Sequence, residues 1–139
     1  PQPVATTITT KNEGAKIVLD MNDEWDKVSD TKLVMGCIVA RNEYIEQNPE
    51  AVKIFLEEYK ESVESVNSDI DTAAALCEEY GIVASAGIAK QAIPYCNIVF
   101  EDGAELKNDL SAYLQFLYDC NPSSVGGALP DDSFYYEAE

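Results

Sequence analysis

The sequence predicts an α/β fold in which helices pack on short strands. Three short apolar runs, at residues 16–20, 33–40 and 96–100, are bounded by polar or turn-forming residues, as buried strands are. From residue 49 onward the apolar residues instead follow steps of three and four, the period of an amphipathic helix. A chain of 139 residues is long enough for one modest domain.

The charge balance excludes one class of partner. The chain has 26 Asp and Glu against 9 Lys and Arg, which gives a formal net charge of -17. Because this field repels a phosphate backbone, we expect no nucleic-acid partner. The acidity favours solubility, and a surface that meets a basic partner stays open as the alternative. The apolar run 33–40 is far shorter than the roughly 20 residues that cross a bilayer.

The first 40 residues predict two strands around an acidic stretch. KIVLD, residues 16–20, is β-branched and follows Gly14. Residues 21–32 contain the only tryptophan, Trp25, and predict a turn or a short helix whose indole packs over the strands. LVMGCIVA, residues 33–40, repeats the strand pattern.

A long helix is predicted after this second strand. Asn48 is a good N-cap, Pro49 fits the first helical position, and Glu50 faces the positive end of the helix dipole. The apolar stripe then runs for about five turns at 3.6 residues per turn. Its members are Val52, Phe55, Leu56, Tyr59, Val63 and Val66.

Three further helices and a short strand are predicted in the second half. One helix runs from residue 68 or 69 to 80 and ends at Gly81 in a left-handed conformation, and a weaker one covers 85–92. After the strand 96–100, the last long helix begins near Gly103 and stops at Asn121. Beyond it we expect an irregular arm whose end, with the cluster Phe134, Tyr135 and Tyr136, docks on an apolar surface.

No catalytic or metal constellation is apparent in the sequence. The absence of histidine removes Ser–His and Cys–His pairs and the usual zinc and haem ligands. The carboxylates of the long helix are interpreted as a solvated face. We therefore expect no metal and no cofactor. Cys37, Cys77, Cys96 and Cys120 form no CxxC pair, which favours thiols packed in the core, although two disulfides in three connectivities stay open.

The order of these segments carries a family resemblance. KIVLD, EWDKV, MGCIVAR and YIEQNPEAVKIFLEEYKESVESVN together resemble the carboxy-terminal part of ABC importer solute-binding proteins. Within these, they resemble the family that binds sulfonates, nitrate, taurine or thiamine-precursor pyrimidines. In that family a strand ending in Val-Ala-Arg returns the chain from the second lobe to the first, and a helix beginning Asn-Pro-Glu follows. The opening PQPVATT resembles the family's Pro-containing segment, with Gln2 where the family usually has Glu.

The resemblance implies a partial periplasmic-binding-protein-like type II fold and a binding function. Residues 1–34 would end the second lobe, and residues 35–139 would form the carboxy-terminal part of the first lobe, with the hinge strand and a surface tail. The protein would capture a small solute outside the cytoplasm and deliver it to an ABC permease without being an enzyme, anchored by lipid in its full-length form. The residues expected nearest the ligand are Gln2, Pro3, Met35, Gly36, Cys37 and Asn97.

Two other classes of function stay open. The first is an enzyme of thiamine-pyrimidine synthesis on the same fold, which the absence of histidine disfavours. The second is an acidic helical module that acts by binding other proteins. Binding of a small molecule would favour the solute-binding protein, and turnover would favour the enzyme. Apolar surface left exposed also predicts self-association.

Overall fold

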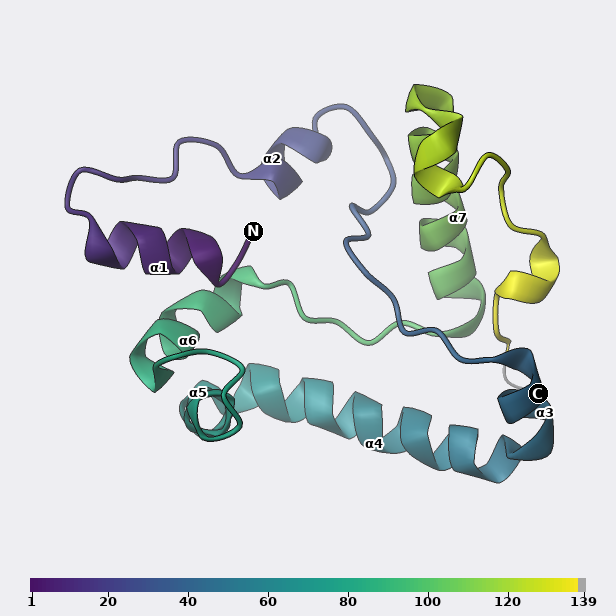
Figure 1. Ribbon diagram of the computed structural model, residues 1–139, viewed down its shortest axis with the longest axis horizontal. Coiled ribbons are helices and arrows are strands. Elements are labelled where there is room, and N and C mark those ends of the chain that lie inside the picture. Colours follow the sequence, from purple (N-terminus) through teal and green to yellow (C-terminus); the bar gives the residue numbers. More distant parts are fainter. Residues whose placement is uncertain (138–139) are drawn as a thin grey trace. The chain divides into compact units, whose positions relative to one another are not determined.

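The protein is described by a computed structural model over residues 1–137, in which helices are joined by extended and irregular segments (Figure 1). The α-helices are α1 (Val4–Lys11), α2 (Met21–Trp25), α3 (Asn42–Gln47), α4 (Pro49–Ser68), α5 (Ile70–Glu79), α6 (Ala86–Ala92) and α7 (Gly103–Cys120). The 3-10 helices are η1 (Ile93–Tyr95), η2 (Pro122–Val125) and η3 (Asp132–Phe134).

The predicted α/β fold is wrong, because residues 1–137 contain no β-strand. The segments 16–20, 33–40 and 97–100 lie outside the helices, but none of them forms a ladder with another segment of the described chain. A β-strand forms only when its backbone N–H and C=O groups hydrogen-bond to those of a neighbouring strand, and an apolar sequence alone does not provide that neighbour. A periplasmic-binding-protein-like sheet is therefore not what these residues form.

The predictions of helices α4, α5, α6 and α7 are confirmed. Helix α4 begins with Pro49 and carries Glu50 in its first turn. At the start of α5, Asp69 accepts hydrogen bonds from the backbone N–H and the hydroxyl of Thr72, at 3.1 and 2.7 Å. These bonds, the hydroxyl bond first, lower the pKa of the Asp69 carboxyl. Gly81 follows α5 with φ +67°, the left-handed conformation that the sequence predicts.

Helices α1 and α3 were not predicted from the sequence. Helix α1, VATTITTK, is rich in β-branched residues, which favour strands. Its threonine hydroxyls are satisfied within the helix, because Thr7 donates to the carbonyl of Pro3 at 3.0 Å and Thr9 to that of Ala5 at 3.1 Å. This local hydrogen bonding stabilises a conformation that residue propensity alone disfavours.

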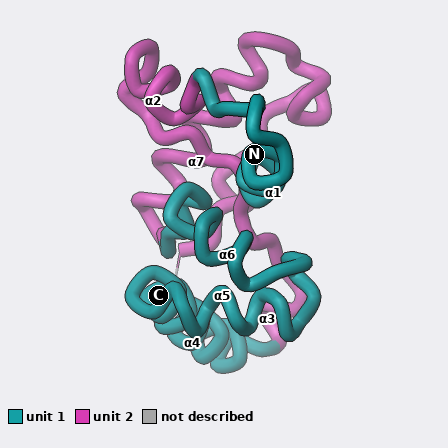
Figure 2. The backbone as a smooth tube through the Cα atoms, turned by 90° about the vertical axis from the view of Figure 1, so that its left-hand side faces the viewer, with its two compact units in different colours: residues 1–18, 48–100 teal, residues 19–47, 101–139 magenta. Residues whose placement is uncertain are grey.

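The chain forms two compact units (Figure 2), and the first contains residues 1–18 and 48–100. Its core lies where α5 and α6 meet and consists of Ala73, Ala74, Ala89 and Ile93. Small side chains let two helix backbones approach closely, so this contact gains its stability from close packing. Outside the core, Glu78 accepts a hydrogen bond from the backbone N–H of Ala86 at 2.9 Å.

The second unit contains residues 19–47 and 101–139 and is organised around α7. The buried Trp25 of α2 meets the rings of Tyr113 and Phe116 edge-on, with centroids 5.7 and 4.7 Å away. Its indole N–H donates to the carbonyl of Thr31 at 2.5 Å. The predicted short helix is thus confirmed, but the indole packs on α7 and not on strands.

The irregular arm after α7 is held to that helix near its start by a serine and further on by a lysine. The hydroxyl of Ser124 donates to the carbonyl of Leu117 at 3.1 Å. Lys107 Nζ lies 3.3 Å from a carboxylate oxygen of Asp132 and 3.2 Å from one of Glu137, and 5.9 Å from the ring centroid of Tyr135. Hydrogen bonds to Glu137 and then Asp132 raise the pKa of Lys107. Of the aromatic cluster expected to dock on an apolar surface, Phe134 is exposed, whereas Tyr135 and Tyr136 are partly buried. That docking stays a prediction.

The cysteines depart from the predicted core positions. Cys77 packs against the α5–α6 core, but Cys37, Cys96 and Cys120 are exposed, and all four thiols are free. The apolar neighbours of Cys37 do not bury it because Met35 and Ile38 are themselves exposed. The predicted division into residues 1–34 and 35–139 stays a prediction, and its boundary lies inside the second unit.

Candidate functional site

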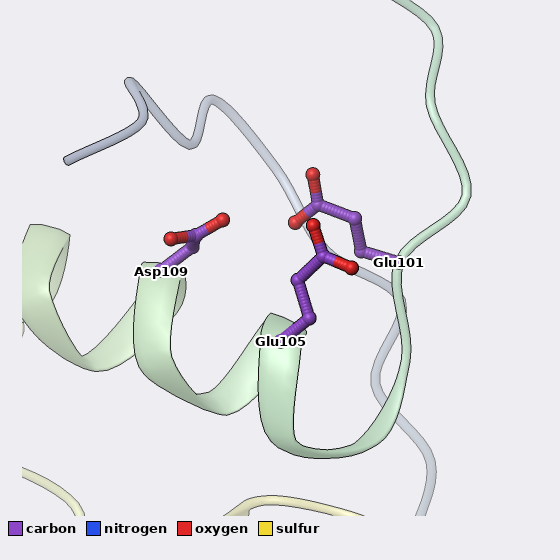
Figure 3. Close-up of side chains that lie close together, drawn as sticks. All are labelled: Glu101, Glu105 and Asp109. Atoms are coloured by element: carbon purple, nitrogen blue, oxygen red, sulfur yellow. The ribbon is translucent and has the colours of Figure 1, made fainter.

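Three carboxylates and one ammonium group gather at the start of α7, in the second unit. Glu101 precedes the helix, and Glu105 and Asp109 follow on it one and two turns later. Figure 3 shows the three side chains directed toward one another, and oxygens of all three lie within 4.8 Å of one another. Lys32 comes from the extended segment that follows α2. We call these four residues the Lys32 cluster.

Lys32 lies at the centre of this cluster. Its Nζ donates to Glu101 at 2.8 Å and to Glu105 at 2.9 Å, and lies 2.9 Å from the buried Oδ2 of Asp109. The contact between Lys32 Nζ and Asp109 Oδ2 is short enough for an ion pair but lacks the geometry of a hydrogen bond. The interaction of Oδ2 with Lys32 is therefore electrostatic. The pKa of Lys32 is raised, first by the hydrogen bond to Glu101 and then by Asp109 and Glu105.

The cluster is partly buried and electrically unbalanced. The side chains of Glu101 and Asp109 are only 13% and 11% exposed, whereas those of Lys32 and Glu105 are 53% and 68% exposed. Three carboxylates and one ammonium give a net charge of -2 when all are ionised. Like charges one helical turn apart repel, so Lys32 reduces a repulsion that the helix would otherwise carry.

The chemistry of the cluster is that of a cation site. Clustered carboxylate oxygens are the ligands that Mg²⁺ and Ca²⁺ prefer. Here the ammonium of Lys32 already lies within 2.9 Å of an oxygen of each of the three. A metal ion would have to displace that ammonium group. In this structure the cation among the three carboxylates is therefore the side chain of Lys32.

Sequence reasoning missed this cluster. The signal was present as acidic residues at 101, 105 and 109, a spacing that places them on one side of a helix. Acidic residues at helical spacing ordinarily indicate a solvated face, and Lys32 lies 69 residues before Glu101. Only the fold brings the lysine and the carboxylates together.

Three of the six expected ligand residues belong to the first unit. The amide oxygen of Gln2 accepts hydrogen bonds from the backbone N–H and the hydroxyl of Thr6, at 3.1 and 2.7 Å, so it is engaged at the start of α1. Pro3 follows a cis peptide bond, and Asn97 has a positive φ of 50°. No contact joins Asn97 to Gln2 or Pro3 among the described interactions.

The other three lie in the second unit, in the extended segment between α2 and α3. Met35, Gly36 and Cys37 are all exposed. None of them contacts the Lys32 cluster through an ion pair or hydrogen bond in the described part of the chain. A ligand-binding role for these six residues stays a prediction.

Comparison with known proteins gives one match. A family model described as menaquinone biosynthesis matches residues 6–116, which is 111 of the 139 residues. No curated protein and no solved structure matches the chain. The matched range contains all four residues of the Lys32 cluster.

This match corrects the function that the resemblance implied. The chain is not identified as part of a sulfonate, nitrate, taurine or thiamine-precursor solute-binding protein, and neither solute capture nor an ABC permease partner is supported. The expectation that it is not an enzyme is also wrong, because the family is one of biosynthesis. The enzyme alternative was closer, but it named thiamine-pyrimidine synthesis. Self-association has no support.

Localisation outside the cytoplasm with a lipid anchor stays a prediction. Among residues 1–137 no helix is both long enough and apolar enough to span a bilayer.

Proposed function

We propose that this chain, which belongs to the menaquinone biosynthesis family, forms part of an enzyme that catalyses a step in making menaquinone. The observation that carries the proposal is the family match over residues 6–116. A match to four fifths of the chain includes most of α1 and all of α2 to α6, and it reaches into the second half of α7.

The Lys32 cluster is our candidate for the polar centre of that enzyme. Lys32 and Glu105 are half-exposed or more, so both could meet a substrate, while Glu101 and Asp109 are largely covered. A carboxylate and an ammonium held within 2.9 Å can orient a polar substrate or exchange a proton with it. Without histidine, such pairs are the main acid–base groups that the chain offers.

The family assignment is tested by genetics. The gene that encodes the complete protein is deleted in the organism that carries it, and menaquinone is measured by mass spectrometry of extracted quinones. We expect menaquinone to disappear and to return when the wild-type gene is restored. Unchanged menaquinone in the deletion strain would refute the proposed function.

The site assignment is tested separately with a matched pair of variants. Glu105→Gln removes the charge of the exposed member of the cluster, and Glu57→Gln removes the charge of an exposed carboxylate on α4. If the cluster takes part in the reaction, Glu105→Gln restores less than about a tenth of the menaquinone, on the scale of one lost acid–base group, and Glu57→Gln restores all of it. If both variants restore menaquinone equally and the deletion strain still lacks it, the proposed function stands and the Lys32 cluster is excluded as its site.

A further inference from the structure

The chain contains one Asp-Gly pair, Asp102–Gly103, and it lies where α7 begins. In a pair of this kind the backbone nitrogen of the second residue can attack the carboxyl carbon of the aspartate and close a five-membered succinimide ring. Glycine in the second position favours ring closure, because it has no Cβ to crowd the nitrogen. A folded protein permits the reaction only where neither reacting group is engaged by other residues.

The carboxylate of Asp102 is not engaged, unlike those of other aspartates that precede helices. Asp20, Asp69 and Asp131 each accept a hydrogen bond from a backbone N–H of the helix that follows. Asp102 has the same position before α7, but its side chain makes no such bond. Among residues 1–137 it forms no ion pair either, and the residue is exposed.

The backbone nitrogen of Gly103 is equally free to react. The first N–H groups of a helix have no partner inside it, and no described residue accepts a hydrogen bond from Gly103. The carbonyl of Asp102 accepts from the N–H of Leu106 at 3.3 Å, which is longer than the usual range for such a bond. The backbone can therefore turn toward ring closure at the expense of one long hydrogen bond.

The Asp132–Ser133 pair provides the contrast within the same chain. Its second residue is also small, but the backbone N–H of Ser133 donates to Asp131 at 2.9 Å. The carboxylate of Asp132 lies 3.3 Å from Lys107 Nζ. Both groups that would have to react are thus engaged, so the structure protects this pair.

We propose that Asp102–Gly103 is a modification site, at which the folded protein isomerises spontaneously to isoaspartate. The nitrogen of Gly103 bonds to Cγ of the protonated Asp102 carboxyl, the Cγ–OH bond breaks, and the hydroxyl leaves with the amide proton as water. A second water then opens the ring. Attack at Cγ restores aspartate, whereas attack at the α-carbonyl carbon leaves the nitrogen bonded to Cγ and frees the α-carboxylate. Water is the only co-reactant, and the mass of the chain does not change.

The modification would disturb the Lys32 cluster. Isoaspartate lengthens the backbone between residues 102 and 103 by one bond. Glu101 lies before this link, whereas Glu105 and Asp109 follow it on α7 (Figure 3). The hydrogen bond of 2.8 Å from Lys32 to Glu101 spans the link and would be strained or broken. Activity would then fall as the enzyme ages, and this consequence, unlike the modification itself, rests on the proposed function.

Peptide mapping of the complete protein tests the proposal. Folded protein at neutral pH and a sample unfolded in guanidinium chloride are incubated in parallel, and isoaspartate is followed by electron-transfer fragmentation, which distinguishes it from aspartate of equal mass. We expect Asp102 to isomerise at similar rates in both samples. Asp132 should isomerise on the order of tenfold more slowly in the folded sample, the effect of roughly one net hydrogen bond.

Two variants serve as controls. Asp102→Glu keeps the charge but would have to close a six-membered ring, which forms far more slowly, so we expect no isomerised product at position 102. Asp102→Asn loses ammonia in the same five-membered ring closure and should gain mass as aspartate and isoaspartate accumulate. These measurements do not depend on menaquinone synthesis, so they stand or fall separately from the proposed function.

The two rates at Asp102 decide the outcome. Isoaspartate that forms in the folded protein about as fast as in the unfolded sample supports the proposal. A folded-state rate below about a tenth of the unfolded rate overturns it, because the fold would then protect the pair by as much as a hydrogen bond does. Isomerisation of folded Asp102 no faster than that of folded Asp132 overturns it as well.

Discussion

At the scale of single residues, Lys32 decides the charge balance at the start of α7. Lys32→Met leaves three carboxylates with oxygens within 4.8 Å of one another and no cation among them. We expect a lower melting temperature at pH 7 by circular dichroism, because the carboxylates then repel one another. Lys32→Arg keeps the charge and should retain most of the stability. Equal melting temperatures for wild type and Lys32→Met would show that solvent already screens the cluster.

The pH dependence of this contribution has a definite sign. The pKa of Lys32 is raised in the folded state above its ordinary value of 10.5. The contribution is therefore fully present below pH 10.5 and is lost as the pH rises further toward the raised folded-state pKa. The difference in melting temperature between wild type and Lys32→Met should stay constant from pH 7 to about pH 9 and narrow above about pH 10.5. A difference that widens at alkaline pH would contradict this linkage.

Sequence predicts residue partners poorly here. The sequence predicts that Trp25 packs over strands, but it lies against Tyr113 and Phe116, about 90 residues later in the chain. Cys37 was expected in the core and is exposed. In both cases the residue type predicts that the side chain is buried. Which surface buries it, if any, depends on the tertiary fold.

At the scale of elements, the contact between α5 and α6 depends on small side chains. Ala74 is 2% exposed and belongs to the core, whereas the adjacent Ala75 is exposed on the same helix. Ala74→Leu should lower the free energy of unfolding by about 1–3 kcal/mol, because the added atoms have no space between the helices. Ala75→Leu is the matched control and should change it by less than about 0.5 kcal/mol. Urea titration followed by circular dichroism measures both, and equal effects would refute the close contact.

Helices α4 to α7 were predictable from the sequence and the pairing of the extended segments was not, for one physical reason. A helix pairs its backbone N–H and C=O groups with one another. Local sequence features, such as the apolar stripe of α4 and the N-cap Asp69 of α5, are therefore enough to predict it. An extended run becomes a strand only with a neighbour, and LVMGCIVA has none among residues 1–137. The threonines of α1 show the converse, since hydroxyl bonds to preceding carbonyls hold a β-branched run in a helix.

At the scale of the whole molecule, the excess of acidic residues opposes compaction. With 26 Asp and Glu against 9 Lys and Arg, the carboxylates outnumber the cations almost three to one, so repulsion between carboxylates dominates. Raising sodium chloride from about 10 to 150 mM shortens the screening length from about 30 to about 8 Å. We expect the melting temperature to rise by a few degrees over this range, measured by calorimetry. A fall would mean that ion pairs such as those of Lys32 outweigh the general repulsion.

The single tryptophan has a consequence for following the protein in solution. Trp25 belongs to the second unit, and the first unit has tyrosine and phenylalanine but no tryptophan. Excitation at 295 nm therefore reports the environment of α2 and α7 alone, while far-ultraviolet circular dichroism reports helices of both units. Two optical signals thus separate the behaviour of the two halves of the chain without any label.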